Sequence, residues 1–172
     1  DVLAQADCEC AVALDPKSPK QGAALPPFVP QKSSLRYLFT HCLDIRRAPG
    51  RPLLRVLADA ARDATEQRRL LELCSAQGVA EFTAHVRQAA LSLVDMLLAF
   101  PSVKPPVERM IENLPRLMPR PYSVSSCAQT SSRRVRFAYS VRHESAESGR
   151  RYARTGVMTE TMCGWRIGEE VK

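Results

Sequence analysis

The chain has 172 residues, a formal net charge of +7, 45% apolar residues and 25% charged residues. This length allows one hydrophobic core or two small subdomains, and the composition is ordinary for a soluble globular protein. No apolar run reaches the roughly 18 residues that a membrane-spanning helix needs, so we expect no membrane partner. The first residues include neither an initiator methionine nor a signal-like segment, which indicates an internal piece of a longer protein.

Positive charge is concentrated in residues 131–154, which hold seven arginines and two glutamates. Such a segment favours an acidic partner, a phosphate-bearing ligand or nucleic acid, although a solvated arginine-rich surface gives the same pattern. Phe137 and Tyr139 are interleaved with arginines, but alternate residues of a strand point to opposite faces. The aromatic and basic side chains would then not share one stacking surface, so we expect no nucleic-acid partner.

Six cysteines are present, and neither a Cys-x-x-Cys pair nor a cysteine–histidine set at zinc-ligand spacing occurs. Cys42 and Cys74 lie among apolar residues on predicted helices, where cysteine behaves as a small hydrophobic residue. His41 and His85 fall on different predicted helices, which argues against a metal pair. We therefore expect no metal site, and reduced cysteines in a cytoplasmic protein.

The first 32 residues predict a strand followed by a connector. Residues 7–15 alternate in character, which indicates a short half-buried strand. Five prolines between positions 15 and 32 then disfavour the interior of any helix or strand. This segment is therefore predicted to be an extended connection.

Residues 33–115 show a hydrophobic period of 3.6 and predict a block of five helices. The first helix has its cap at Ser33 or Ser34 and runs to about Ile45. The second begins near Pro52, because a proline in the first turn removes no hydrogen bond that the helix needs.

Three more helices follow in this block. Thr65 is the predicted cap of the third helix, and Gly78 is its predicted C′ residue. The fourth helix carries one continuous apolar stripe from Phe82 to Phe100 and is stopped by the next proline. The fifth is short and lies within residues 105–114, between two proline-containing segments.

After Pro119 the hydrophobic period changes from 3.6 to 2. Residues 135–142 alternate between apolar and mainly basic side chains, which predicts a strand with one apolar and one basic face. A turn over 144–149 and a returning strand over 150–154 follow. The fold class is therefore α+β, with a helical block inserted between pieces of sheet whose edges are open.

Two segments of this second part carry groups suited to a dinucleotide. Arg120 offers a planar guanidinium that can bind a pyrophosphate through two hydrogen bonds. Residues 156–159 place a glycine at a helix start, where N–H groups attract anions. Tyr122 can form an aromatic wall for a flavin ring, with Ser123 as a donor beside it. A surface ion pair for Arg120 and a core position for Tyr122 are the alternatives.

Residues 114–126, which contain Arg120-Pro121-Tyr122-Ser123, resemble the start of the flavin barrel in diflavin reductases of the cytochrome P450 reductase type. Residues 35–45 and 100–106 are similar to the helical connecting domain of the same family. The resemblance runs from about residue 24 to residue 159. It implies an all-α connecting subdomain inserted into part of an antiparallel β-barrel of the ferredoxin-reductase-like FAD-binding type.

The resemblance also implies a role for each residue of the candidate site. Arg120 would bind the FAD pyrophosphate, Tyr122 would stack on the isoalloxazine, and Ser123 would hydrogen-bond near its redox-active nitrogen as the catalytic candidate. The other expected cofactor-binding residues are Pro121 in the motif, Phe137 and Tyr139 on the strand that reaches the rest of the FAD, and the phosphate loop of Gly156, Val157, Met158 and Thr159.

The implied layout has four parts, and the last departs from the family. These parts are a barrel strand with its proline-rich connector over 1–32, the helical connecting subdomain over 33–115, an FAD-binding barrel segment over 116–159 and a divergent tail over 160–172. In relatives a Gly-Trp pair follows almost directly after the phosphate loop, whereas here Glu160-Thr161-Met162-Cys163 precede Gly164-Trp165. Either four residues are inserted, or the similar part of the chain ends at Thr159. Some relatives also use an arginine on the fourth helix, where this chain has Ala90.

Full-length members of the family are NADPH-dependent oxidoreductases that pass electrons from NADPH through FAD to FMN. The member that the chain resembles most reductively reactivates cobalamin-dependent methionine synthase. FAD is therefore the expected cofactor, with FMN and NADPH bound only in the full-length enzyme. The expected partners are a flavodoxin-like FMN-binding domain and methionine synthase. Alone, the chain is expected to be inactive with NADPH; the alternative is a non-catalytic helical interaction module that no longer binds flavin.

Overall fold

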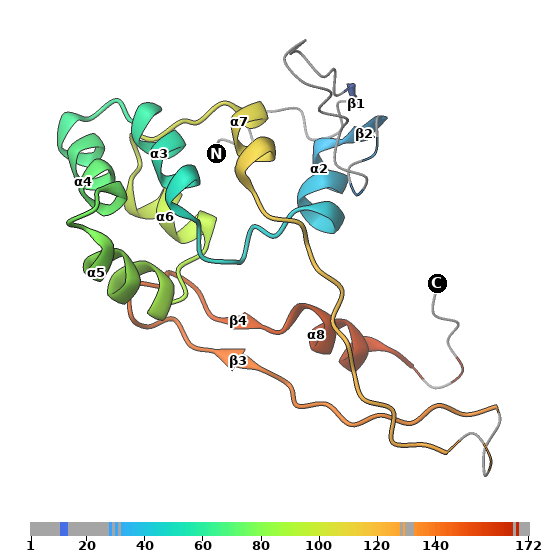
Figure 1. The fold of residues 1–172 in the computed structure, drawn as a ribbon. Helices are drawn as coiled ribbons and strands as arrows, with labels where there is room; N and C mark the ends of the chain where they lie inside the picture. The colour runs from blue at the N-terminus through green and yellow to red at the C-terminus, as the bar shows by residue number, and fades with distance from the viewer. Residues whose placement is uncertain are drawn as a thin grey trace. The chain divides into compact units, whose positions relative to one another are not determined.

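The computed structural model describes residues 11–13, 28, 30, 32–127, 129, 133–166 and 168. The chain divides into two compact units, Asp1–Leu117 and Met118–Lys172. The first is mainly helical, and the second consists of long, largely irregular stretches of chain followed by one helix (Figure 1). None of the helices in the described part of the chain has the length and apolar character needed to cross a membrane.

The first unit begins with a small antiparallel sheet. Strand β1 (Ala11–Ala13) pairs with β2 (Lys32–Ser34), and Ala11 lies opposite Ser34. The strand predicted for residues 7–15 is therefore confirmed over residues 11–13. The rest of that prediction, and most of the proline-rich connector, lie outside the described residues.

Short helices make up the rest of this unit. They are α2 (Leu35–Tyr37), the π-helical turn η1 (Leu38–Cys42), α3 (Arg51–Asp59), α4 (Ala64–Cys74), α5 (Val79–Phe82), the π-helical turn η2 (Thr83–Gln88), α6 (Leu93–Ala99) and α7 (Val107–Asn113). Their apolar faces form one core, in which α3 packs against α4 and α7. Leu38, Leu54 and Leu70 are completely buried in it. Each such leucine contributes about 1.5–3 kcal/mol through burial.

The first predicted helix begins as expected but ends early. Ser34 is its cap and accepts a hydrogen bond from the Tyr37 N–H at 3.2 Å. The helix stops at Cys42 rather than near Ile45, because Leu43 is extended and pairs with the chain near residue 116. That pairing satisfies backbone groups that would otherwise belong to another helical turn.

One boundary around α3 and α4 is where it was predicted, and two are not. Pro52 lies in the first turn of α3, as predicted. Asp63, rather than Thr65, caps α4, since its carboxylate accepts hydrogen bonds from two successive N–H groups at 2.9 Å. Gly78 begins α5 instead of ending α4, and its missing side chain allows the backbone to approach Glu72 closely.

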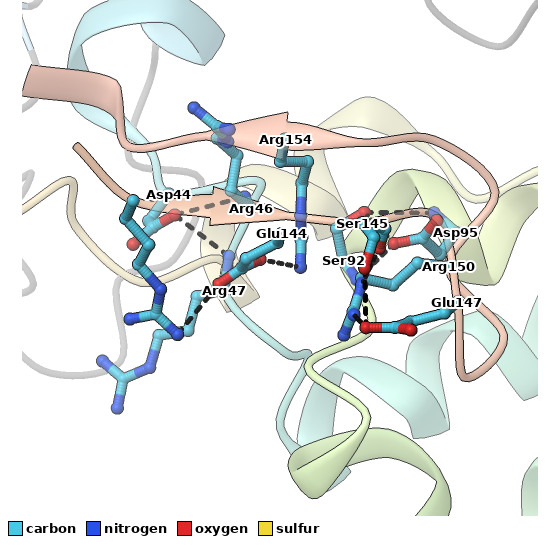
Figure 2. A network of polar contacts seen from close by, with 11 residues as sticks. Asp44, Arg46, Arg47, Ser92, Asp95, Glu144, Ser145, Glu147, Arg150 and Arg154 are labelled. Atoms are coloured by element: carbon cyan, nitrogen blue, oxygen red, sulfur yellow. Dashed lines mark hydrogen bonds and ion pairs between the residues drawn. The ribbon is translucent and has the colours of Figure 1, made fainter. Parts of the chain in front are cut away.

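The prediction of one continuous fourth helix was wrong, because the structure divides this segment in two. α5 and η2 end at Gln88, and α6 begins at Leu93. Between them Ala90 adopts a left-handed backbone with φ of 51°. Ser92 and Asp95 then form a capping box that starts α6, and both side chains are buried (Figure 2). A capping box satisfies the first N–H groups of a new helix, which stabilises the break.

α7 confirms the last helix of the block. It begins directly after Pro105-Pro106 and ends at Asn113, because Leu114 is extended. The chain then leaves the helical unit near Arg116.

The second unit contains one small hairpin and one helix. β3 (His143–Glu144) pairs antiparallel with β4 (Arg154–Thr155), and α8 (Val157–Gly164) follows directly. The predicted turn between the strands is present, with Ser148 and Gly149 at φ of 55° and 89°. The returning strand begins at Arg154 rather than at residue 150. The Arg150 N–H still donates to the Glu147 carbonyl within the turn at 3.0 Å, and the Arg150 guanidinium donates to the Ser145 carbonyl at 2.9 Å.

The strand predicted over residues 135–142 is present only in part. Within it Phe137 forms an antiparallel bridge with Val124, and the Ser125 N–H donates to the Arg136 carbonyl at 2.7 Å. The remaining residues of this segment are irregular, and Val135 is 70% exposed. The described residues therefore form a helical block and two separate two-stranded sheets, which agrees with the α+β class, while the partial antiparallel β-barrel stays a prediction.

Candidate functional site

Three aromatic side chains that the sequence singled out lie together in the second unit. The ring centroids of Tyr122 and Phe137 are 5.9 Å apart, those of Tyr122 and Tyr139 are 6.3 Å apart, and those of Phe137 and Tyr139 are 6.1 Å apart. These separations lie in the range where tilted aromatic pairs attract each other. Phe137 and Tyr139 are still 39% and 38% exposed. We call Tyr122, Phe137 and Tyr139 the aromatic cluster.

Local pairing explains why these three rings meet. Phe137 and Tyr139 are two residues apart, so an extended backbone directs both side chains to one face. The bridge between Val124 and Phe137 then brings the segment of Tyr122 alongside. The Arg136 N–H also donates to the Ser126 hydroxyl at 3.1 Å, which strengthens this pairing.

The other residues of the Arg-Pro-Tyr-Ser motif are accessible. Arg120, Pro121 and Ser123 are exposed, whereas Tyr122 is half-buried. One guanidinium nitrogen of Arg120 donates to the Met118 carbonyl, which orients the side chain. A guanidinium has five N–H donors, so the remaining donors can bind an anion.

The predicted helix start at residues 156–159 is confirmed. Gly156 precedes the first residue of α8, and its N–H donates to the Arg142 carbonyl at 2.9 Å. The buried Thr159 hydroxyl donates back to the Gly156 carbonyl at 3.1 Å. A Cβ atom at residue 156 would lie only 2.6 Å from the Thr159 Oγ1. A larger residue at this position would therefore require the Thr159 hydroxyl to move, and the half-buried Val157 and Met158 contribute N–H groups at a helix start, which favour anions.

Ion pairs hold the hairpin that leads into Gly156. The guanidinium of Arg154, whose side chain is 5% exposed, pairs with Glu144 at 2.7 Å (Figure 2). Arg142 pairs with the same carboxylate at 2.9 Å. Across the turn, Arg150 and Glu147 form a longer pair of 3.5 Å. Part of the arginine-rich segment is thus used to fix the hairpin.

Cys163 is a neighbour of the aromatic cluster that sequence reasoning missed. Its Sγ lies 3.9 Å from the Tyr139 hydroxyl oxygen, and Cys163 itself is exposed near the end of α8. A hydrogen bond with Cys163 raises the pKa of the Tyr139 phenol above its usual value, and burial and the nearby Tyr122 act in the same direction. The contact joins residues that are 24 positions apart, so no local pattern in the sequence signalled it.

These groups fit a flavin dinucleotide. The cluster offers an aromatic surface, Arg120 an accessible cation, and Gly156 a backbone that a phosphate can approach closely. By contrast, the described residues include no group of three or more His, Cys, Asp or Glu side chains placed to hold a metal ion. His41 instead lies against the Tyr37 ring, at 4.8 Å between centroids.

Similarity to known proteins points the same way. The family model described as FAD binding domain matches residues 2–160. Methionine synthase reductase of Caenorhabditis elegans is 53% identical over 171 residues, which are 99% of this chain and 25% of the relative. Methionine synthase reductase of Homo sapiens is 42% identical over 85% of this chain and 20% of the relative. NADPH–cytochrome P450 reductase of Dictyostelium discoideum is 28% identical over 80% of this chain and 20% of the relative.

The chain thus spans about a quarter or less of the length of the curated relatives it matches. The alignment with the Caenorhabditis elegans protein covers nearly every residue and so extends into the tail after Thr159. With the family model matching most of the sequence, the chain belongs to the FAD binding domain family and is a homologue of methionine synthase reductases.

Proposed function

We propose that this chain is the FAD-binding portion of an NADPH-dependent diflavin oxidoreductase. In the full enzyme, electrons would pass from NADPH through FAD to FMN and serve the reductive reactivation of cobalamin-dependent methionine synthase. The names of its relatives, methionine synthase reductase and NADPH–cytochrome P450 reductase, support this proposal. The partners are then a flavodoxin-like FMN-binding domain and methionine synthase, in the cytoplasm.

The aromatic cluster is the observation that carries the proposal. Tyr122 stacks on the isoalloxazine, and Arg120, two residues earlier, binds the pyrophosphate. Ser123, one residue later, hydrogen-bonds near the redox-active nitrogen. Two observations support these roles. The ring of Tyr122 belongs to the aromatic cluster, and Arg120 and Ser123, which flank Tyr122 in the sequence, are exposed. A flat apolar surface beside hydrogen-bond donors is what an isoalloxazine with a phosphate tail requires.

The start of α8 supplies the second part of the site. Gly156 and the N–H groups of residues 157–159 also bind the pyrophosphate, and Phe137 and Tyr139 complete the cofactor contacts. The turn at Gly156 supports this role, because glycine has no side chain that would stand between the backbone and a phosphate. When bound, FAD supplies hydride acceptance and single-electron transfer, while the protein supplies binding and orientation.

Flavin titration tests the proposal directly. We expect the 172-residue chain to bind FAD, and Arg120→Ala to weaken binding by at least about tenfold, because a charged hydrogen bond is worth about 1.5–3 kcal/mol. Arg133→Ala is the matched control, since Arg133 is also exposed in the same unit. Equal losses in the two variants would remove the case for a dedicated pyrophosphate cation. The chain alone is expected not to oxidise NADPH, which dye reduction would detect.

A second function, a helical interaction module without flavin, has one observation in its favour. The large apolar core lies entirely in the first unit, so the helical block has the packing expected of an independent module. A colourless protein whose absorbance does not change on addition of FAD would support this alternative. A yellow protein that retains flavin through gel filtration would support the first.

A further inference from the structure

The second turn of α8 makes three separate attachments. The Glu160 N–H donates to the Gly156 carbonyl at 2.9 Å, and the Glu160 carboxylate accepts from the Thr155 hydroxyl. Met162 is buried. Cys163 reaches the Tyr139 hydroxyl. The turn is therefore fixed by hydrogen bonds at Glu160, and it contacts the aromatic cluster through Cys163.

α8 thereby joins the two parts of the candidate site. Its start is the glycine turn at Gly156, and Cys163, seven residues later, contacts Tyr139. Seven residues of α-helix span about 10 Å along the axis. A helix bends little over this length, so the glycine turn and Tyr139 are kept at a set distance. Tyr139 in turn contacts the rings of both Tyr122 and Phe137.

We propose that the turn Glu160–Cys163 is a positioning element of the flavin site, which holds the aromatic cluster at a fixed distance from the phosphate-binding start of α8. The proposal rests on the FAD function proposed above. Cys163 acts by orienting Tyr139, and Tyr139 acts by orienting Tyr122. Four residues separate Thr159 from Gly164 in the sequence. Their proposed role is to place Cys163 against Tyr139.

This arrangement assigns different parts of the ligand to different parts of the protein. The cluster faces the isoalloxazine, and the start of α8 faces the pyrophosphate. Loss of the Cys163–Tyr139 contact should therefore weaken ligands that carry the flavin ring and leave ADP unaffected. Loss of overall folding would instead weaken all of them.

The experiment compares FAD, FMN and ADP binding to the 172-residue chain and five variants. Cys163→Ala and Tyr139→Phe each remove the same contact, and we expect about a threefold loss of FAD and FMN affinity from each. In the double variant the loss should not increase, because both changes delete one interaction. Tyr139→Ala also removes two aromatic pairs and should cost about tenfold. Thr161→Ala is the control, since Thr161 lies on the same turn and bonds only its own helix in the contacts described.

A second readout separates positioning from a purely structural effect. The visible circular dichroism of bound flavin reports the asymmetric environment of the ring, and it should change in Cys163→Ala but not in Thr161→Ala. Full additivity of the two single variants, an equal loss of ADP affinity, or unchanged flavin affinity and dichroism in Cys163→Ala would overturn the proposal. A wild-type chain that binds FAD while these variants behave like the control would refute only the positioning role. A wild-type chain without FAD binding would overturn the proposed function together with it.

Discussion

Replacing Asp95 with alanine should destabilise the helical unit by about 3 kcal/mol. The carboxylate of Asp95 accepts hydrogen bonds from the Ser92 N–H at 2.9 Å and from the Ser92 hydroxyl at 2.7 Å. Both residues are buried, with exposed fractions of 1% and 0%. Truncation leaves two buried donors without this acceptor, at about 1–3 kcal/mol for each unsatisfied group. Since the hydroxyl can rotate toward another acceptor, we count one full loss and about 1 kcal/mol for the cap.

Urea unfolding followed by far-ultraviolet circular dichroism measures this change as a shift in midpoint at constant slope. Asp59→Ala is the matched control, because Asp59 pairs with Arg55 at 3.1 Å while both side chains are more than half exposed. Such pairs contribute about 0.2–1 kcal/mol. Asp95→Asn keeps one acceptor oxygen and should fall between the two. If Asp95→Ala cost no more than Asp59→Ala, the capping box could not be what divides the predicted fourth helix.

Three further substitutions test other parts of the fold. Gly78→Ala should destabilise the first unit by more than about 2 kcal/mol in thermal unfolding, because the new Cβ would lie 2.0 Å from the Glu72 carbonyl oxygen. Glu144→Ala should cost about 2–4 kcal/mol and make the hairpin more sensitive to proteolysis, because it removes the carboxylate that pairs with buried Arg154. Burial raises the pKa of Cys42 above its ordinary value of 9.0, so the unfolded thiol ionises first and stability should fall as pH rises beyond that value. Cys42→Ala should reduce this alkaline loss in urea titrations at several pH values.

Each of these changes has an internal comparison. Gly164→Ala should be nearly neutral, since a Cβ there meets no atom within 4 Å. Glu147→Ala should cost less than about 1 kcal/mol, because Glu147 is largely exposed in a long ion pair. If Gly164→Ala were as damaging as Gly78→Ala, or if Cys42→Ala left the alkaline slope unchanged, the corresponding steric or titration argument would be refuted.

Elements with strong local chemistry could be predicted from the sequence. Pro52 marks the first turn of α3, and the paired prolines before Val107 mark the start of α7, because proline restricts the backbone wherever it stands. The apolar residues of the helical block also form the core that their spacing predicted. Hydrophobic periodicity shows which face of a helix is buried. It therefore predicts the core residues better than the ends of the helices.

The division of the fourth helix shows where that reasoning fails. Phe82, Val86 and Leu93 are all buried, so one apolar stripe passes through the break. Periodicity therefore could not detect it. The sequence did contain the signal, since Ser92 and Asp95 have the spacing of a capping box. Here the capping box decided the structure, although the apolar stripe is longer. The capping box satisfies the buried N–H groups at the start of α6, and these groups are left unpaired only where a helix begins.

The candidate site was predictable in its residue types but only partly in its geometry. Arg120, Tyr122 and Gly156 were selected because a pyrophosphate and a flavin ring require a cation, an aromatic surface and a close backbone. The structure gives each a suitable local setting. Cys163 could not be found in this way, because its contact with Tyr139 joins residues that are 24 positions apart. No period or motif within one element encodes such a contact.

The aromatic cluster changes what the alternating segment 135–142 means. An apolar face on a strand ordinarily indicates burial against a core. Here Val135 and Val141 remain exposed, while Phe137 and Tyr139 turn toward Tyr122, fifteen or more residues earlier in the chain. Exposed aromatic rings that contact one another retain an accessible surface that a packed core would not. A ligand with a large planar ring can cover that surface, so under the proposed function flavin binding should reduce the exposure of both rings to solvent.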